Sequence, residues 1–515
     1  MIFISMHNNK GQMLSKQPWI SAAFLLLLTS IISKAFGFFR EILIAKNFGI
    51  SSQVDAYLVA ISIPVLIGGT IGSAFAISIV PLYHKMINNS LKEANDFLKT
   101  VFSFTIIVSI ALIFTVNFMS EAIIKIIAPS LPVSTMKSAV ELTKWLSLLL
   151  LGYSLFNVLS SIYNALHHFK IPAFTDMFSN LFIIIALVLL SSLLGIYALV
   201  IGVIVSIYFS LLIFVFYLLK QGIVGFNLDF KSNKFKEFII FIAPVMVFMF
   251  FLQISSIVEN FFASSLKGGS IAALGYAKRL YDIIPTLIIA NIAKAVFPTF
   301  STLFLEQKID ELRDLIVKLN KQFIIYFLPV SFMLIFFRKE IIRVVFMRGA
   351  FNELALEMTS GAFMFYAMGL TASTLVPIFF RLCYAFSDTV TPLIAVFSGS
   401  VFMCLLNYFL TPVMGITGIA LTNSLTVLLT LFVLGIFVRK KLGGLNIKGF
   451  AKSFIISFIC ATLALLPFLK FTNSNPYYFI FLAILYFIFY FILGWFIAKS
   501  EFKVVWFSFK RIIMK

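Results

Sequence analysis

The chain has 515 residues, of which 61% are hydrophobic and only 12% are charged, with a mean hydropathy of +1.06. Soluble domains carry about 45–50% apolar and roughly 25% charged residues, so this composition excludes a soluble globule and indicates an all-α polytopic membrane protein. The net charge of +20 is assigned to basic loops that face anionic lipid, and no nucleic-acid partner is expected.

Apolar windows in chain order predict fourteen transmembrane helices. A span needs about 20 apolar residues, and longer windows that contain proline or glycine are expected to bend or to extend beyond the membrane. Residues 1–18 precede the first window as a cytoplasmic segment. The windows cover residues 20–45, 55–83, 100–120, 143–165, 173–193, 196–219, 238–263, 271–303, 318–337, 355–384, 390–410, 413–438, 450–470 and 477–498.

The positive charges predict the orientation of these spans. With the N-terminus inside, roughly 25 of the 40 basic residues fall on inside segments and about 10 fall on outside segments. We therefore predict that both termini are cytoplasmic. The basic segment 338–348 opposes the rule and is the weakest part of the predicted topology.

Five basic residues lie inside the first and eighth windows, namely Lys34, Arg40, Lys278, Arg279 and Lys294. A cation in a span costs about 2.5–3.5 kcal/mol on insertion scales, so it is usually kept for a water-filled cavity or a partner. The two arginines are expected to face a cavity, with Glu41 and Asp282 as acidic neighbours. Lysine stems can instead reach the membrane interface by snorkelling.

Two stretches of the chain share one spacing pattern. In each, alanine is followed after 7 residues by proline and after 23 more by glycine: Ala165, Pro172 and Gly195, then Ala385, Pro392 and Gly415. This repeat predicts two six-helix lobes, an N-lobe over residues 19–220 and a C-lobe over residues 221–440, related by an axis along the membrane normal. Residues 441–515 then form two C-terminal helices and a basic cytoplasmic tail.

Several residue patterns occur in order along the first twelve windows: Ser33-Lys34, Gly37, Arg40-Glu41, Asp55-Ala56, Pro64, Ile171–Phe174, Asn180, Pro244, Gln253, Glu259, Phe262–Ser264, Tyr276–Leu280, Pro285, Pro298, Arg348–Phe351, Tyr384-Ala385 and Asp388–Pro392. They resemble the MurJ/MviN lipid II flippase family. The resemblance implies the multidrug/oligosaccharidyl-lipid/polysaccharide exporter fold in a bacterial cytoplasmic (inner) membrane. It also implies a central cationic cavity and two extra helices grooved for a lipid tail.

The function that the resemblance implies is movement of undecaprenyl-pyrophosphate-linked peptidoglycan precursor, lipid II, from the inner to the outer leaflet by alternating access. No bond is broken, and fixed cations favour transfer of a diphosphate out of water, arginine more than lysine. The expected substrate-binding residues are Lys34, Arg40, Glu41, Asp55 and Arg279. The expected partners are the lipid-linked glycan precursor, membrane lipids and proteins of cell-wall synthesis.

No catalytic, nucleotide-binding or firm metal motif is found, so an enzyme with a cofactor is not expected. Membrane potential or an ion gradient must then drive transport. Glu259, Asn407 and Asn423 form a candidate site for a coupling cation such as sodium, because they supply oxygen ligands on predicted spans. Hydrogen bonding between helices is the alternative explanation for these three residues.

The second window departs from the family pattern. Gly68, Gly69 and Ser73 stand where the family carries an arginine pair and a glutamate, and Lys34 stands where the family has arginine. We expect Lys34 to compensate, and an arginine added at position 68 to be tolerated. Three alternative functions remain open: a flippase for another polyprenyl-linked polysaccharide unit, a cation-coupled small-molecule exporter of the same fold, and a scaffold for envelope assembly without transport activity. A separate alternative for the charged residues is that they only pair helices within the bundle.

Overall fold

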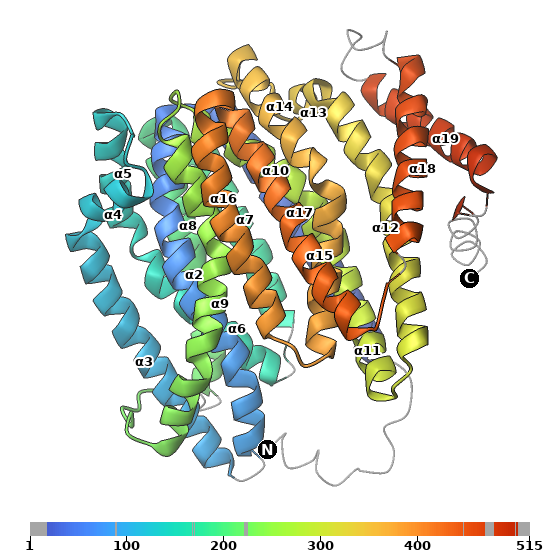
Figure 1. Ribbon diagram of the computed structural model, residues 1–515. Coiled ribbons are helices and arrows are strands. Elements are labelled where there is room, and N and C mark those ends of the chain that lie inside the picture. Colours follow the sequence, from blue (N-terminus) through green and yellow to red (C-terminus); the bar gives the residue numbers. More distant parts are fainter. Residues whose placement is uncertain are drawn as a thin grey trace.

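The computed structural model describes residues 18–87, 90–166, 168, 170–220, 225–445, 447–468, 478–499 and 501–502. Within these ranges the chain is helical and contains no strand, which confirms the all-α fold class. Figure 1 shows long helices packed side by side, with α18 and α19 at one flank of the bundle. Each of the fourteen predicted windows coincides with one helix or with consecutive helical segments.

The first half of the chain contains eight helices in its described residues. They are α1 (Pro18–Phe48), α2 (Ser52–Ile87), α3 (Leu91–Phe118), α4 (Ser120–Ile127), α5 (Val133–Leu146), α6 (Leu149–Ala165), α7 (Lys170–Leu194) and α8 (Tyr197–Lys220).

The second half follows the same plan, with α9 (Asn233–Ala263), α10 (Ser270–Ile284), the π-helix η1 (Pro285–Ile289), α11 (Ala290–Leu305), α12 (Ile309–Phe336), α13 (Arg338–Phe346), α14 (Glu353–Met368), α15 (Leu370–Ala385), α16 (Val390–Met414) and α17 (Ile416–Lys441). It is followed by α18 (Ile447–Leu465), the 3-10 turn η2 (Leu466–Phe468) and α19 (Tyr478–Ile497). Proline at the start of η1 cannot donate a helical hydrogen bond, which explains the break between α10 and α11.

Ten of the described helices are long and apolar enough to cross a membrane, and the number rises to twelve if each of two bent pairs is one span. Neither α1 nor the unit formed by α10, η1 and α11 is among them. These are the segments that hold the five basic residues predicted inside the membrane. Fourteen spans therefore stays a prediction.

The helices repeat between the two halves. The pair α5 and α6 bends by 43°, and the pair α14 and α15 bends by 48°. Gly195 after α7 and Gly415 after α16 have nearly equal φ angles of +55° and +58°. A short helix, α4 or α13, precedes each bent pair. The domain boundaries at residues 220 and 440 stay predictions.

The basic segment that opposed the positive-inside rule forms the short helix α13. Lys339 of α13 pairs with Glu357 of α14 at 2.5 Å, and Arg343 lies 3.4 Å from Glu353. Carboxylates of the next helix thus offset these charges locally, which the count of basic residues alone ignores.

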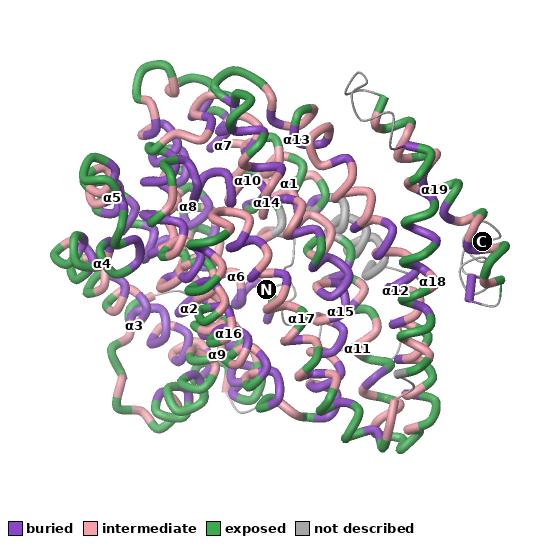
Figure 2. Tube along the Cα trace, turned by 45° about the horizontal axis from the view of Figure 1, so that its top comes forward, coloured by how far each residue is buried: buried purple, intermediate pink, exposed green. Residues whose placement is uncertain are grey.

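The buried core is continuous at one end of the bundle and divided at the other. One hydrophobic cluster joins α1, α2 and α5 of the first half to α10, α13 and α14 of the second. We call this the sealed end; it contains residues 49–51 and 264–269. Away from it, one cluster lies among α2, α3, α6, α8 and α9, and a separate one lies among α11, α12, α15 and α17. Figure 2 shows α18 and α19 at the edge, with long exposed stretches.

Candidate substrate and coupling sites

A buried carboxylate on α1 holds two arginines. Glu41 is 5% exposed, and its Oε1 accepts hydrogen bonds from Nη2 of Arg40 at 2.8 Å and from Nε at 3.2 Å. Its Oε2 forms an ion pair with Arg279 of α10. Figure 2 places α1 and α10 in the middle of the bundle. We call Arg40, Glu41 and Arg279 the arginine cluster; it brings together three of the predicted substrate-binding residues.

Helix α7 orients the arginine cluster. Nη1 of Arg40 donates to Oδ1 of Asn180 at 3.1 Å, and Ser33 donates to Asp176 at 2.6 Å. The amide of Asn180 also lies 3.3 Å from the Ser33 hydroxyl. Sequence reasoning missed Asp176. The signal was two polar residues four positions apart, 176 and 180, which share one face of an otherwise apolar helix.

The arginine cluster carries more positive than negative charge and stays accessible. The side chain of Arg40 is 28% exposed and that of Arg279 is 36% exposed, although Glu41 between them is buried. Lys34, two turns before Arg40 on α1, is exposed and has no hydrogen bond or ion pair within the described residues. One carboxylate therefore neutralises one of two guanidinium groups, and a free ammonium group lies further along α1.

A second buried carboxylate, Glu259 of α9, is paired with a lysine. Nζ of Lys278, on α10, lies 2.8 Å from both carboxylate oxygens, and the Asn423 amide of α17 donates to Oε1 at 2.9 Å. We call these three residues the lysine cluster. The structure thus joins two of the three predicted cation-site residues. The third, Asn407, is buried on α16, and neither atom of its amide has a hydrogen-bond partner in the described structure.

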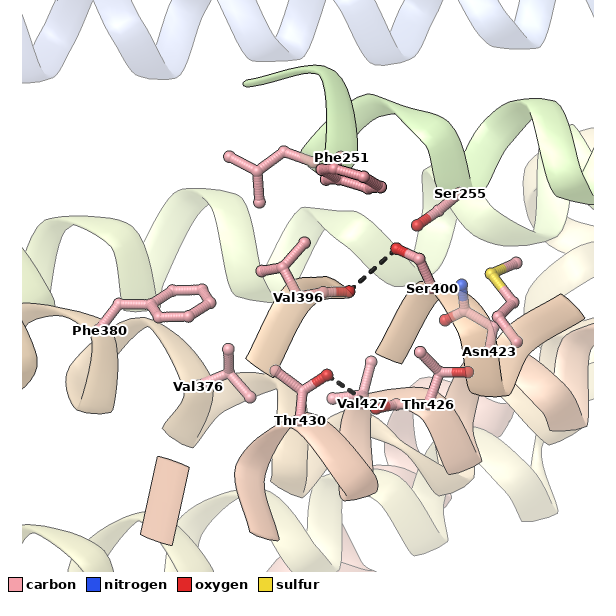
Figure 3. Close-up of a pocket in the computed structure, with 12 residues that line it drawn as sticks. Phe251, Ser255, Val376, Phe380, Val396, Ser400, Asn423, Thr426, Val427 and Thr430 are labelled. Atoms are coloured by element: carbon pink, nitrogen blue, oxygen red, sulfur yellow. Dashed lines mark hydrogen bonds between the residues drawn. The ribbon is translucent and has the colours of Figure 1, made fainter. Parts of the chain in front are cut away.

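A small cavity of about 180 Å³, whose lining is more apolar than polar, adjoins the lysine cluster between α9, α15, α16 and α17. Figure 3 shows Asn423, Ser255, Ser400 and Thr430 among the residues that line it. Ser400 and Thr430 donate to backbone carbonyl groups of their own helices, as the dashed lines mark. Since a water molecule occupies about 30 Å³ in the liquid, the cavity has room for several.

Asp55 lies at the sealed end, where it caps α10. Its Oδ2 accepts a hydrogen bond from the Gly269 N–H at 2.5 Å, and its Oδ1 accepts one from the Ala272 N–H at 2.7 Å. Gly269 has φ +88°, and a Cβ there would lie 2.3 Å from the Ile50 carbonyl oxygen, so only glycine fits. The structure therefore joins Asp55 to backbone of the other half and not to the arginine cluster.

The glycines of α2 pack against α6. A Cβ on Gly68 would lie 3.2 Å from the Leu150 carbonyl oxygen, and one on Gly72 would lie 2.8 Å from the side chain of Asn157. A side chain at position 68 therefore requires α6 to shift by a few tenths of an ångström, and the tolerance of an arginine there stays a prediction. Gly69 has nothing within 4 Å of an added Cβ and is the open position.

A larger cavity of about 1220 Å³ lies between α12, α15, α17 and α18. Its lining is mostly apolar and includes Leu328, Phe332, Leu375 and Phe454. Helix α18, one of the two C-terminal helices, thus forms part of the wall of this apolar groove.

Comparison with known proteins identifies the family. The family profile described as Lipid II flippase MurJ matches residues 44–488. The chain is 28% identical over 451 residues to the probable lipid II flippase MurJ of Buchnera aphidicola subsp. Schizaphis graminum (strain Sg), covering 86% of this chain and 88% of the relative. It is also 28% identical over 401 residues to the probable lipid II flippase MurJ of Aquifex aeolicus (strain VF5), covering 75% and 78%.

Solved structures agree with this assignment. A lipid II flippase MurJ in an inward closed conformation superposes with a TM-score of 0.80 at 26% identity, over 93% of this chain and 99% of that one. An inward-facing multidrug resistance MATE transporter shares the fold alone, with a TM-score of 0.63 at 13% identity over 80% and 94%. Because the family profile covers most of its length, the chain belongs to the lipid II flippase MurJ family.

Proposed function

We propose that this chain moves lipid II from the inner to the outer leaflet of the bacterial cytoplasmic membrane. The observation that carries the proposal is the arginine cluster: two partly exposed guanidinium groups share one buried carboxylate in the middle of a bundle that has the family fold. No bond is broken in such a reaction, so we assign the chain no catalytic residue.

The arginine cluster suits a diphosphate. A planar guanidinium donates two parallel hydrogen bonds to phosphate oxygens, and such bonds strengthen where water is scarce. An arriving diphosphate competes with Glu41 for Arg40 and Arg279. Glu41 therefore neutralises part of the positive charge before substrate binds, and the site still accepts an anion. Lys34, which has no partner in the described structure, adds attraction along α1.

Transport by alternating access requires the sealed end to open. The Asp55 cap on α10 and the hydrophobic cluster that joins the halves must separate, while the two divided clusters approach each other. The apolar groove beside α18 is proposed to hold the polyprenyl tail while the headgroup occupies the interior. Both termini are proposed to be cytoplasmic, which places the sealed end outside.

The energy source is proposed to be the membrane potential or a cation gradient, since no nucleotide motif occurs in the sequence. Glu259, Asn407 and Asn423 remain the candidate residues for coupling. A role for proteins of cell-wall synthesis as partners is likewise a proposal.

The decisive experiment is replacement of the resident lipid II flippase. Cells depleted of that flippase should grow when this chain is expressed, and purified chain in proteoliposomes should move lipid II between leaflets. Good membrane insertion without rescue would instead favour another polyprenyl-linked glycan as substrate. Export of a cationic small molecule by the same proteoliposomes would favour the exporter alternative.

A further inference from the structure

We propose that the Lys278 ammonium is a resident counter-ion that occupies the carboxylate site a free cation would otherwise fill, so that transport by this chain does not depend on sodium. The proposal rests on the proposed function and deepens it, because it concerns how the same protein is coupled. It starts from Glu259, which the sequence placed in a candidate cation site and which the structure shows already neutralised.

The Lys278 ammonium fills the edge of the carboxylate at which a cation would contact both oxygens. Nζ of Lys278 lies at 2.8 Å from both oxygens of Glu259, which is the position of a cation held by two oxygens. The Asn423 amide donates to the same carboxylate, and an amide NH₂ group repels a metal ion at that position. Glu259 is 7% exposed, so its charge requires a partner in this environment.

The resident cation is tied to the substrate site through α10. Lys278 and Arg279 are adjacent on this helix, and they point about 100° apart, one toward Glu259 and the other toward Glu41. A displacement of α10 therefore moves both cations together. A diffusible ion would bind and leave with each cycle, whereas a tethered ammonium stays with the helix that carries a phosphate-binding arginine.

Removing the ammonium should expose a site that a small cation can reach. The cavity of about 180 Å³ in Figure 3 ends at Asn423 and has room for water molecules. Once Lys278 is shortened, Asn423 can turn its carbonyl oxygen toward Glu259, and the carboxylate, this carbonyl and water supply oxygen ligands for sodium.

The test measures sodium binding to the purified full-length chain with radioactive sodium, and unfolding temperature in sodium chloride against choline chloride. We expect the wild type to bind no sodium and to unfold at the same temperature in both salts. Lys278→Ala should bind about one sodium ion per chain and gain about 2 °C or more in sodium chloride. Lys294→Ala is the matched control, because it removes a lysine of α11 that is exposed and forms no ion pair in the described structure.

Either of two results would overturn the proposal: sodium binding by the wild type, or a folded Lys278→Ala that binds none. If Lys278→Ala does not fold, the wild type and the double variant Glu259→Gln/Lys278→Met, which replaces the ion pair by neutral side chains of similar shape, still decide the question. Sodium binding to the wild type contradicts a filled site. Sodium binding to the double variant, which lacks the Glu259 carboxylate, contradicts the assignment of the cation site to Glu259. These readouts do not involve lipid II, so they stand whether or not the chain rescues flippase depletion.

Discussion

The two buried glutamates of this protein, Glu41 and Glu259, lie in groups of different net charge. Glu41 lies between two arginines, and the group as a whole keeps a positive charge that reaches solvent. Glu259 is paired with one lysine and one amide, and that group is neutral. The difference teaches that a carboxylate next to basic residues does not by itself indicate an anion site. The ratio of cations to carboxylates and the exposure of the cations decide.

Helix α10 provides a basic partner for each of the two glutamates. α10 contributes Arg279 to the arginine cluster and Lys278 to the lysine cluster. Four predictions concern the charges at and near the arginine cluster, the packing of a seam away from both glutamates, and the orientation of both clusters in the membrane.

The largest effect is expected from Arg279→Ala and from Arg40→Ala. Each variant leaves Glu41 with one remaining arginine, so the protein should insert and fold, but the paired guanidinium site is lost. We expect lipid II transport in proteoliposomes to fall by about 100-fold, which corresponds to losing one charge-assisted phosphate contact. Arg279→Lys should also be impaired, because an ammonium group cannot donate as a planar fork.

The level of each arginine variant in the membrane is the control for this prediction. If both alanine variants disappear from the membrane, the arginines pair helices and do not serve the substrate.

A somewhat smaller effect is expected from Lys34→Ala. Lys34 is exposed and has no partner in the described residues, so its removal should change stability by less than about 0.5 kcal/mol. If it supplies the attraction that the family's span-two arginines give elsewhere, transport should fall by about tenfold or more, enough to stop rescue of a depleted strain. Full growth with Lys34→Ala would refute the compensation hypothesis.

Away from both glutamates, the seam between α2 and α6 provides a baseline for packing alone. Gly72→Ala should lower the free energy of unfolding by about 1–3 kcal/mol, because the new methyl group meets Asn157 and the Tyr153 carbonyl oxygen. Gly69→Ala is the matched control, and it should be neutral or raise stability by up to about 1 kcal/mol. Unfolding temperatures in detergent compare the two variants, and equal values would contradict the packing described for this seam.

The smallest perturbation is a cysteine reporter, which should leave transport unchanged. In a chain whose three native cysteines are replaced, a reagent that does not cross membranes should label a cysteine near Lys267 from outside. It should not label one near Lys234 or at the C-terminal residue 515, which lies outside the described residues. Labelling of the C-terminus from outside would reverse the predicted orientation. The sealed end, and the side from which the two glutamates are reached, would then be exchanged between the two faces of the membrane.

Composition and residue patterns were enough to predict the helices and the family. Apolar windows of span length become helices because a chain in lipid must satisfy its backbone hydrogen bonds locally. The predicted windows therefore match the observed helices, and basic residues within two of them marked α1 and α10 before any contact was known. The residue pattern likewise indicated the family that the comparisons show.

Which side chains meet could be seen only in the packed helices. Asn180 reaches Arg40 across 140 positions of sequence, and Asn423 reaches Glu259 across 164. No local pattern encodes such a pairing, because it depends on how each helix is rotated against its neighbours. For the same reason no sequence pattern placed Asp55 at the start of α10 or position 68 against α6. A role of Asp55 in substrate binding stays a prediction. Helix formation follows from a segment and its solvent, whereas a site follows from the packing of several segments.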